Sequence, residues 1–444
     1  MTTSSPSSTL PPSIWSLAWP TTLANLLLAS VGIVQIVLAA DLGSDAASAV
    51  AVSQRVFFVL QAALFGLAMG VSALVARNIG ANHHDKAGQT TQSGMLLGLM
   101  VSIFMGAICY AVAPEIVSWF NLQGEAQTLA INLILWVCLF NPIYSLNIVL
   151  TTTMRASSDA INPLVLAFIS GLGNGFGCYA LSHGSWGLPN LGAEGLAVGG
   201  VLGSVVSLLV YGTLWRLDKL KVPYPQLSNI RVKTNKLIRI GLPSAIEQSL
   251  MQVGFLVYMV AIASFGNDVL AAYGLGINFL TVIIFVSLGF SSSAAVIVGQ
   301  YMGRGQPELA AKFGWRGWRM CLAFMVVAGI VFEIFGGHLA RAVTDDVLVQ
   351  HYMELFLTIV ALAMPLIATD FAIGGAIRGA GETLYPLKIS FISLILVRFI
   401  LPFLFLEWGL AVQWMFYLTA LDFGIKAVFM TAYFRSGKWQ TKEL

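Results

Sequence analysis

Residues 66–87, GLAMGVSALVARNIGANHHDKA, decide the fold, because residues 289–310, GFSSSAAVIVGQYMGRGQPELA, repeat them at a displacement of 223 positions (289 − 66). The same displacement aligns further glycines, prolines and charged residues without a gap: Pro20 with Pro243, Gly43 with Gly266, Asp45 with Asp268, Pro142 with Pro365, Arg155 with Arg378, and Pro163 with Pro386. A register held over this distance indicates an internal repeat. The chain therefore contains two similar halves, an arrangement typical of secondary transporters.

Composition places both halves in a membrane. Hydrophobic residues make up 57% of the chain and charged residues 10%, whereas about one quarter of a soluble protein is charged. About twelve apolar stretches are long enough to cross a hydrocarbon core as helices: near 14–40, 46–76, 90–113, 127–152, 161–183 and 193–215, and near 237–264, 269–299, 315–336, 352–376, 386–406 and 409–434. We therefore expect an all-α polytopic membrane protein with two six-helix lobes related by the repeat.

Basic and acidic residues alternate between successive connections. The basic connections include Arg77, Lys86, Arg155, Arg304, Arg378 and Lys388, and the acidic ones include Asp41, Asp45, Glu115, Glu194, Asp268 and Glu407. The positive-inside rule then predicts a multi-pass protein of the cytoplasmic (inner) membrane with both termini in the cytoplasm. The net charge of +3 is accounted for by these loops, and we expect no nucleic-acid partner.

These spans divide the chain into five parts. We expect a disordered cytoplasmic tail at 1–13, an N-lobe at 14–216, a cytoplasmic linker at 217–236, a C-lobe at 237–434 and a cytoplasmic tail at 435–444. The first dozen residues carry no basic charge, so they do not resemble a cleaved signal peptide. The cysteines lie within apolar spans without metal-ligand spacing, and we interpret them as small core residues: Cys109, Cys138, Cys178 and Cys321.

The motifs resemble those of the multidrug and toxic compound extrusion (MATE) family, in its prokaryotic branch. The resemblance rests on the two stretches above and on IGLPSAIEQ (240–248), GNDVLAAYG (266–274), GAIRGAGETLYP (375–386) and TMRASSDAINP (153–163). It extends over residues 14–434 and implies a central cavity between the lobes that opens alternately to each side. It also implies export of organic cations or drug-like compounds, coupled to inward cation movement. Arg378 is expected to anchor its helix at the lipid headgroups.

Transport chemistry is expected on ionisable groups inside the spans, because a charge at mid-bilayer costs about 2.5 to 3.5 kcal/mol even on insertion scales. Asp422 and Lys426 are four residues apart on one helix, so we expect a structural charge pair. Glu333 lies near the outer end of its span and can snorkel. The sequence assigns no role to Arg55. The remaining ionisable residues of the spans are Glu247, Asp370 and Arg398.

Glu247 and Asp370 are the predicted ion-coupling residues. Glu247 begins a stripe at helical spacing that continues through Met251 and Tyr258, and so combines an acid, a thioether and an aromatic ring. Such a face suits a bulky organic cation. The alternative is a buried glutamate satisfied by a neighbouring helix. Asp370 either couples transport or pairs with Arg398 on the next span.

The N-lobe departs from the pattern of the family it resembles. Prokaryotic members usually carry an Asp in the first helix, where this chain has Gln35, and an Asp four residues after the Asn of the fifth helix, where Cys178 follows Asn174. Gly200 replaces the hydroxyl expected in the sixth helix. We therefore expect coupling by the C-lobe, with a proton favoured over sodium. The residues predicted to line the substrate cavity are Gln35, Asn174, Met251, Tyr258 and Asn278.

Other classes of function fit less well. The chain contains no GxSxG or HExxH pattern, so we expect neither an enzyme nor a metal site, and no cofactor besides the coupling ion. The main alternative is a flippase or exporter of lipid-linked precursors or metabolites from the same superfamily. Such proteins tend to carry a strongly cationic cavity and extra helices. We expect a monomer in the lipid bilayer that binds small organic cations.

Overall fold

The computed structural model describes residues 13–120, 122–217, 220, 222 and 234–441. Nearly all of the expected N-terminal tail and much of the expected linker therefore lie outside the described residues. Within the described part the regular elements are helices, and twelve of them are long and apolar enough to cross a membrane. The expected fold class, an all-α polytopic membrane protein, is confirmed.

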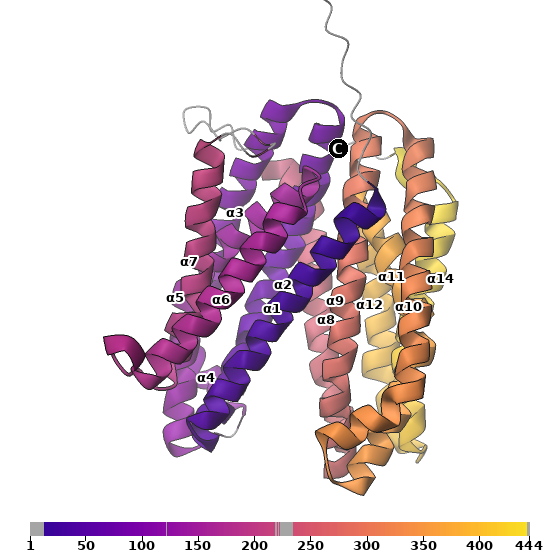
Figure 1. The fold of residues 1–444 in the computed structure, drawn as a ribbon. Coiled ribbons are helices and arrows are strands. Elements are labelled where there is room, and N and C mark those ends of the chain that lie inside the picture. Colours follow the sequence, from indigo (N-terminus) through magenta and orange to yellow (C-terminus); the bar gives the residue numbers. More distant parts are fainter. Residues whose placement is uncertain (1–12, 121, 218–219, 221, 223–233, 442–444) are drawn as a thin grey trace, which may run out of the picture.

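Each lobe contains six spans, and Figure 1 shows the two lobes side by side. The N-lobe consists of α1 (Ile14–Asp41), α2 (Ser44–Gly80), α3 (His84–Ala111), α5 (Gly124–Ala156), α6 (Ile161–His183) and α7 (Glu194–Arg216), with the short α4 (Ala113–Ser118) and η1 (Ser185–Gly187) between them. The C-lobe consists of α8 (Thr234–Ala263), α9 (Asn267–Gly303), α10 (Pro307–Val343), α11 (Val347–Gly379), a compound span and α14 (Val412–Arg435). The compound span joins α12 (Leu384–Ser393), the π-helix η3 (Leu394–Ile400) and α13 (Leu401–Glu407).

The starts of several helices follow directly from the sequence. Gly43 and Gly266, which the repeat aligns, precede α2 and α9 with φ angles of 117° and 109°. Only glycine adopts such angles without strain. At the start of α11 the Asp346 carboxylate accepts hydrogen bonds from the backbone N–H groups of Leu348 and Val349, at 2.8 and 3.2 Å. These two devices fix where long apolar segments enter the bundle.

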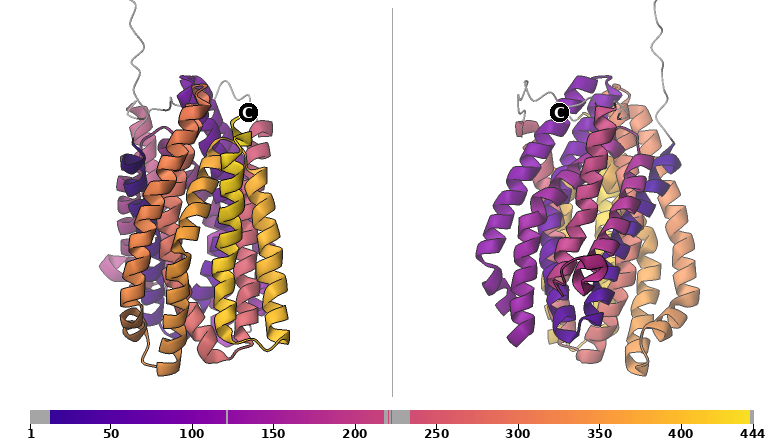
Figure 2. Two further views of the ribbon diagram at one scale, coloured as in Figure 1. Left: turned by 90° about the vertical axis from the view of Figure 1, so that its right-hand side faces the viewer. Right: turned by 60° about the vertical axis from the view of Figure 1, so that its left-hand side comes forward.

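The chain ends in a short 3₁₀ helix, η4 (Lys438–Thr441), that packs on the C-lobe. Trp439 is fully buried, its ring stacks on Phe434, and its indole N–H donates to the Phe434 carbonyl at 2.9 Å. Part of the segment expected to be a tail is therefore fixed to the bundle. In Figures 1 and 2 this end of the described chain lies at the same end of the bundle as the start of α1.

The lobes touch through small residues along one half of their length. Gly66 of α2 lies against the backbone of Ala245 on α8, and Gly303 of α9 lies against the carbonyl of Arg77 on α2. A Cβ atom at either glycine would overlap the facing backbone. Close approach at small residues is how helices associate in lipid, where apolar burial gives little driving force.

Hydrogen bonds between the lobes lie in the same half. The Gln300 amide of α9 donates to the Ala156 carbonyl at 3.0 Å and to the Ser158 hydroxyl at 2.7 Å. On α1, the Asn25 amide donates to the Phe285 carbonyl at 3.3 Å. The lobes are thus joined on the side that carries the basic connections. Figure 1 shows them diverging toward the opposite end.

Candidate functional site

A cavity of about 60 Å³ lies in the C-lobe, where six charged side chains meet. They are Glu247 of α8, Asp370 and Arg378 of α11, Arg398 of η3, and Asp422 and Lys426 of α14. A cavity of this size holds a few water molecules. Met69 of α2 forms part of the wall, so the cavity borders the N-lobe. Charges gathered inside a membrane bundle mark a candidate functional site.

Glu247 is held by an arginine and a serine. Arg378 Nη2 lies 2.6 Å from Glu247 Oε1, and Arg378 Nε donates to Oε2 at 3.2 Å. The Ser390 hydroxyl donates to Oε1 at 2.9 Å. The expectation that Arg378 anchors at the headgroups is wrong, because its guanidinium points inward to a carboxylate that it binds through two hydrogen bonds. Of the two hypotheses for Glu247, this geometry corresponds to a glutamate satisfied by a neighbouring helix.

Asp422 is the centre of a second cluster. Lys426 Nζ lies 3.1 Å from Oδ1, Arg398 Nη2 lies 3.1 Å from Oδ2, and the Ser393 hydroxyl donates to Oδ1 at 2.6 Å. The hypothesis that Asp370 pairs with Arg398 is therefore wrong. Arg398 pairs with Asp422 instead, so α14 and the compound span are joined by charge.

Asp370 is the third carboxylate, and it has no such partner. It is 7% exposed, lines the same cavity, and receives no hydrogen bond or ion pair from any residue in the described ranges. The three acids and three bases of the cavity balance when all are ionised. Protonation of Glu247 or Asp422 would break an existing pair, whereas protonation of Asp370 would break none. Asp370 is thus the group of this cavity best suited to exchange a proton.

The π-helix brings Arg398 into the site. A π-turn contains more residues than an α-turn, so it rotates the side chains that follow it. The guanidinium carbon lies 4.8 Å from the ring centre of Tyr258 and 5.1 Å from that of Phe255. Arg398 Nη1 is buried and has no hydrogen-bond partner in the described part of the chain. Sequence analysis predicted the pair of Asp422 and Lys426 but not that Arg398 joins it, because residue spacing does not reveal a π-turn.

The residues predicted to line the substrate cavity lie in different places. Met251 lines the charged cavity. The prediction for Tyr258 is wrong: its side chain is fully buried, and its hydroxyl donates to the Met415 carbonyl. The stripe on α8 runs from the cavity into the core of the lobe, which is why its far end is buried. Asn278 is exposed on α9, and its amide donates to the Gly274 carbonyl at 3.1 Å.

Gln35 and Asn174 meet in the N-lobe. Gln35 Nε2 lies 3.5 Å from Asn174 Oδ1 and 3.7 Å from Cys178 Sγ, while Gln54 Nε2 lies 3.4 Å from Gln35 Oε1. A Cβ atom at Gly200 would lie 2.8 Å from Gln35 Nε2, so the glycine leaves room for this amide. These groups are neutral amides and a thiol. They suit hydrogen bonding better than the binding of a hard cation, which favours carboxylate oxygens.

The two lobes differ at equivalent positions. Ser170 and Ser393 are aligned by the repeat. The Ser170 carbonyl lies against Gly203 of α7, and the Ser393 hydroxyl donates to the backbone carbonyl of Asp422 on α14 at 3.3 Å. The repeat aligns Gly203 with Lys426 and Gly199 with Asp422, so the N-lobe has glycines where the C-lobe has this charge pair. This contact is backbone packing in one lobe and a network of charges in the other.

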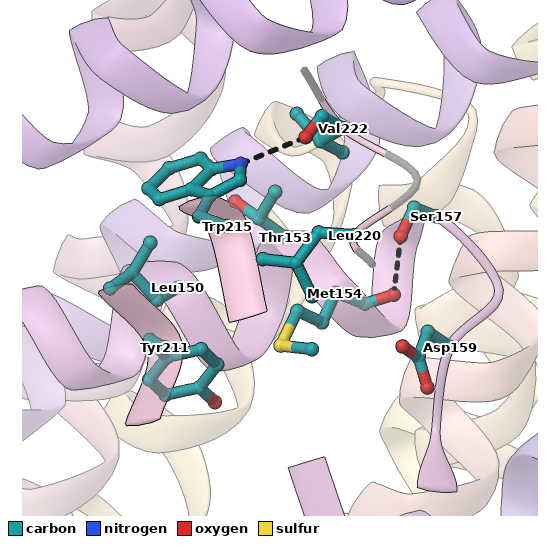
Figure 3. Close-up of a pocket in the computed structure, with 9 residues that line it drawn as sticks. All are labelled: Leu150, Thr153, Met154, Ser157, Asp159, Tyr211, Trp215, Leu220 and Val222. Carbon is teal, nitrogen blue, oxygen red and sulfur yellow. Dashed lines mark hydrogen bonds between the residues drawn. The ribbon is translucent and has the colours of Figure 1, made fainter. Parts of the chain in front are cut away.

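A second cavity, of about 10 Å³, lies beside α5 and α7 (Figure 3). Met154, Tyr211 and Trp215 form part of its wall, and the Trp215 indole N–H donates to the Val222 carbonyl at 2.8 Å. The space suffices for one water molecule. It is too small for an organic substrate.

Comparisons with known proteins agree with this architecture. The family model MatE matches residues 20–179 and again 243–404, so the two matches begin at the prolines that the repeat aligns. The chain is 28% identical over 439 residues to the probable multidrug resistance protein NorM of Thermotoga maritima, covering 96% of this chain and 92% of that protein. It is 26% identical over 391 residues to the probable multidrug resistance protein NorM of Idiomarina loihiensis, covering 85% and 82%.

The fold also resembles a solved structure of a MOP superfamily transporter from Pyrococcus furiosus. The TM-score is 0.89 at 17% sequence identity, over 97% of this chain and 96% of that one. For that transporter a reversed polarity of the binding pocket is described as suggesting a different function. At this level of identity the likeness extends to the fold alone.

Proposed function

The chain belongs to the MATE family of membrane transporters, and from this premise we propose that it exports drug-like organic compounds, organic cations among them, in exchange for protons. The similarity to proteins named for multidrug resistance supports the substrate class. The alternating basic connections support a place in the cytoplasmic membrane with both termini inside.

The observation that carries the proposal is the unpaired carboxylate of Asp370 in a cavity whose other charges are paired. With Asp370 ionised, the cavity is neutral overall and offers one free carboxylate to the positive group of a substrate. When Asp370 binds a proton, the cavity gains a net positive charge and repels that group. Proton and cationic substrate therefore compete, and exchange follows from the competition.

Glu247 has a positioning role in this proposal. Its bond to Arg378 ties α8 to α11, and α11 carries Asp370. The Ser390 hydroxyl extends the same bond to α12. This is a change from the expectation that Glu247 itself carries the coupling ion, because its proton uptake would require the pair to separate.

Alternating access requires the lobes to separate where they are now joined. The contacts that must open are the glycine contacts of α2 and α9 and the hydrogen bonds from Gln300. Each hydrogen bond contributes about 0.5–1.5 kcal/mol, so the closed side can open without a large barrier from these bonds. The charged cavity lies beside this contact, since Met69 of α2 belongs to its wall.

The test is dye accumulation in inverted membrane vesicles. Ethidium is offered under an imposed pH gradient, and then under a sodium gradient at equal pH. The proposal predicts accumulation driven by the pH gradient and indifferent to sodium, and no accumulation in vesicles that lack the protein. Accumulation that requires sodium and ignores the pH gradient would contradict the assignment of the proton.

A further inference from the structure

Arg55 is a charge inside a membrane span that the transport cycle above does not use. It lies eleven residues after the start of α2 at Ser44, a distance of about 16 Å along the helix. A charge at that depth has to face water or a partner. The Arg55 side chain is exposed, and it forms no hydrogen bond or ion pair with the residues that the structure describes. Water therefore has to reach it.

The helical geometry of α2 shows which way Arg55 points. Arg55 and Gly66 are eleven residues apart, which is three turns plus only about 20°. Gly66 lies against Ala245 of the C-lobe, so Arg55 lies on the face that looks toward the C-lobe. Val59, one turn from Arg55 on the same face, is 43% exposed. The face that is buried between the lobes at Gly66 is therefore open at Arg55, where the lobes diverge.

The other lobe has the same geometry. Asn278 and Val282 of α9 are aligned by the repeat with Arg55 and Val59, and both are exposed. They share their helix face with Gly289, which lies against α1 of the N-lobe. The α2 face that carries Arg55 thus continues the contact with α8, and the α9 face that carries Asn278 continues the contact with α1. Both faces border the space between the lobes, with a guanidinium on one lobe and a neutral amide on the other.

No acid on α2 or α9 lies within two turns of Arg55 or of Asn278 along its helix. The nearest acids on these two helices are Asp45 and Asp268 at their outer ends. Each lies ten residues from the pair, about 15 Å along the helix. The side chain of Arg55 is also within electrostatic range of Tyr273 on α9, so its field reaches across to the other lobe. A purely cationic compound that passes between the lobes meets this positive charge.

We propose that Arg55 binds an anionic group of the transported compound, a carboxylate above all, and that Asn278 supplies a hydrogen bond from the other lobe. A guanidinium binds a carboxylate through two parallel hydrogen bonds. The inference rests on the proposed function and narrows its substrate class: compounds that carry both a basic and an acidic group are preferred over simple cations. The basic group uses Asp370, and the acidic group uses Arg55 farther along the route out.

The experiment compares two dyes that differ only at one carboxylate. Rhodamine 110 has a free carboxyl group, and rhodamine 123 is its methyl ester. Accumulation of each is measured in inverted vesicles under a pH gradient for the parent, Arg55→Gln, Arg55→Lys and the control Arg216→Gln, which removes an exposed arginine at the end of α7. In Arg55→Gln we expect the half-saturating concentration of rhodamine 110 to rise about tenfold, the effect of one charged hydrogen-bonded contact.

The ester and the lysine variant make the test specific. Rhodamine 123 should be transported at least as well by Arg55→Gln as by the parent, because the repelling charge is gone. Arg55→Lys should lie between the parent and Arg55→Gln for rhodamine 110, since an ammonium keeps the charge but loses the two-pronged geometry. Equal losses for both dyes in Arg55→Gln, or no change for either, would overturn the assignment.

Failure of the proposed function gives a different result. If the parent accumulates neither dye under any gradient, the transport proposal fails. Binding of rhodamine 110 to the purified protein, followed by fluorescence anisotropy, then decides the present inference by itself. Weaker binding of rhodamine 110 in Arg55→Gln, with unchanged binding of rhodamine 123, supports it, and equal binding to parent and variant refutes it.

Discussion

Glu247→Gln is expected to destabilise the protein, because it leaves the buried Arg378 guanidinium without the carboxylate to which it is hydrogen-bonded. The side chains of the pair are 7% and 11% exposed, so water compensates little. Removing one partner of a buried ion pair costs about 3–5 kcal/mol. Glutamine retains one carbonyl oxygen for Arg378, which places the expected loss near the lower end, at about 3 kcal/mol. Ser390→Ala removes only one hydrogen bond to Glu247, and we expect a loss of about 1 kcal/mol.

The double variant Glu247→Gln with Arg378→Gln measures the interaction between the two side chains separately from the cost of losing each one. Since both charges are gone, its loss of stability should be smaller than the sum of the single losses by at least about 2 kcal/mol. The assay is unfolding in detergent micelles by increasing denaturant, followed by tryptophan fluorescence. The double variant should also retain pH-driven efflux, because Asp370 is intact.

Two results would refute this reasoning about the pair. Single losses that simply add, or that stay within about 0.5 kcal/mol of the parent, would show that Glu247 and Arg378 do not hold α8 to α11. A double variant that is as stable as the parent but has no pH-driven efflux would indicate that Glu247, and not Asp370, carries the coupling proton.

Further predictions concern topology and the N-lobe. Single cysteines placed beside Asp45 or Asp268 should react with an impermeant thiol reagent in sealed cells, and one beside Lys86 should not; the reverse pattern would invert the orientation. Gln35→Asp combined with Cys178→Asp puts two carboxylates beside the Asn174 amide, so efflux by this variant should become sensitive to sodium concentration while efflux by the parent is not. Efflux by the variant that is unchanged from 1 to 100 mM sodium would contradict that reading of the N-lobe.

The fold was predictable because its determinants are repetitive and local. Each half contains six apolar segments, and glycines and prolines recur at the same spacing in both halves. Gly43 and Gly266 precede equivalent helices and both have positive φ angles, which favour glycine, so a helix start at one position predicts a helix start at the other. Burial in lipid leaves a helix as the only way to satisfy the backbone of each segment, which removes most alternatives.

The site was predictable only as a set of residue types. Charges within the spans were singled out correctly as unusual, and five of them surround one cavity together with Arg378, which was expected at the headgroups. Their pairing was not predictable, because Glu247 and Arg378 are 131 positions apart and no periodicity relates them. One of the two alternatives for Asp370, a pair with Arg398, was wrong; Arg398 lies in a π-helix, whose side-chain rotation regular helical spacing does not predict. Long-range packing and an irregular turn therefore decide which carboxylate remains free.

The difference between the lobes suggests a division of labour. The N-lobe packs α6 and α7 through glycines, whereas the C-lobe joins α14 to its neighbour through Asp422, Arg398 and Lys426. Helices packed backbone to backbone at glycines have no side-chain bonds that could be exchanged. A network of charges can exchange partners when a nearby group gains a proton. The C-lobe is therefore the half in which we expect proton binding to change structure.

The central claim is that Asp370 couples transport to protons, and an exchange assay tests it most directly. Asp370→Asn is reconstituted in liposomes, where two activities are measured with an exported dye: exchange of labelled for unlabelled dye without any gradient, and accumulation driven by a pH gradient. The account predicts that Asp370→Asn keeps the exchange and loses the accumulation, since the asparagine amide does not bind a proton near neutral pH. Asp370→Glu should keep both activities. Accumulation by Asp370→Asn at the rate of the parent under the same pH gradient would contradict the account.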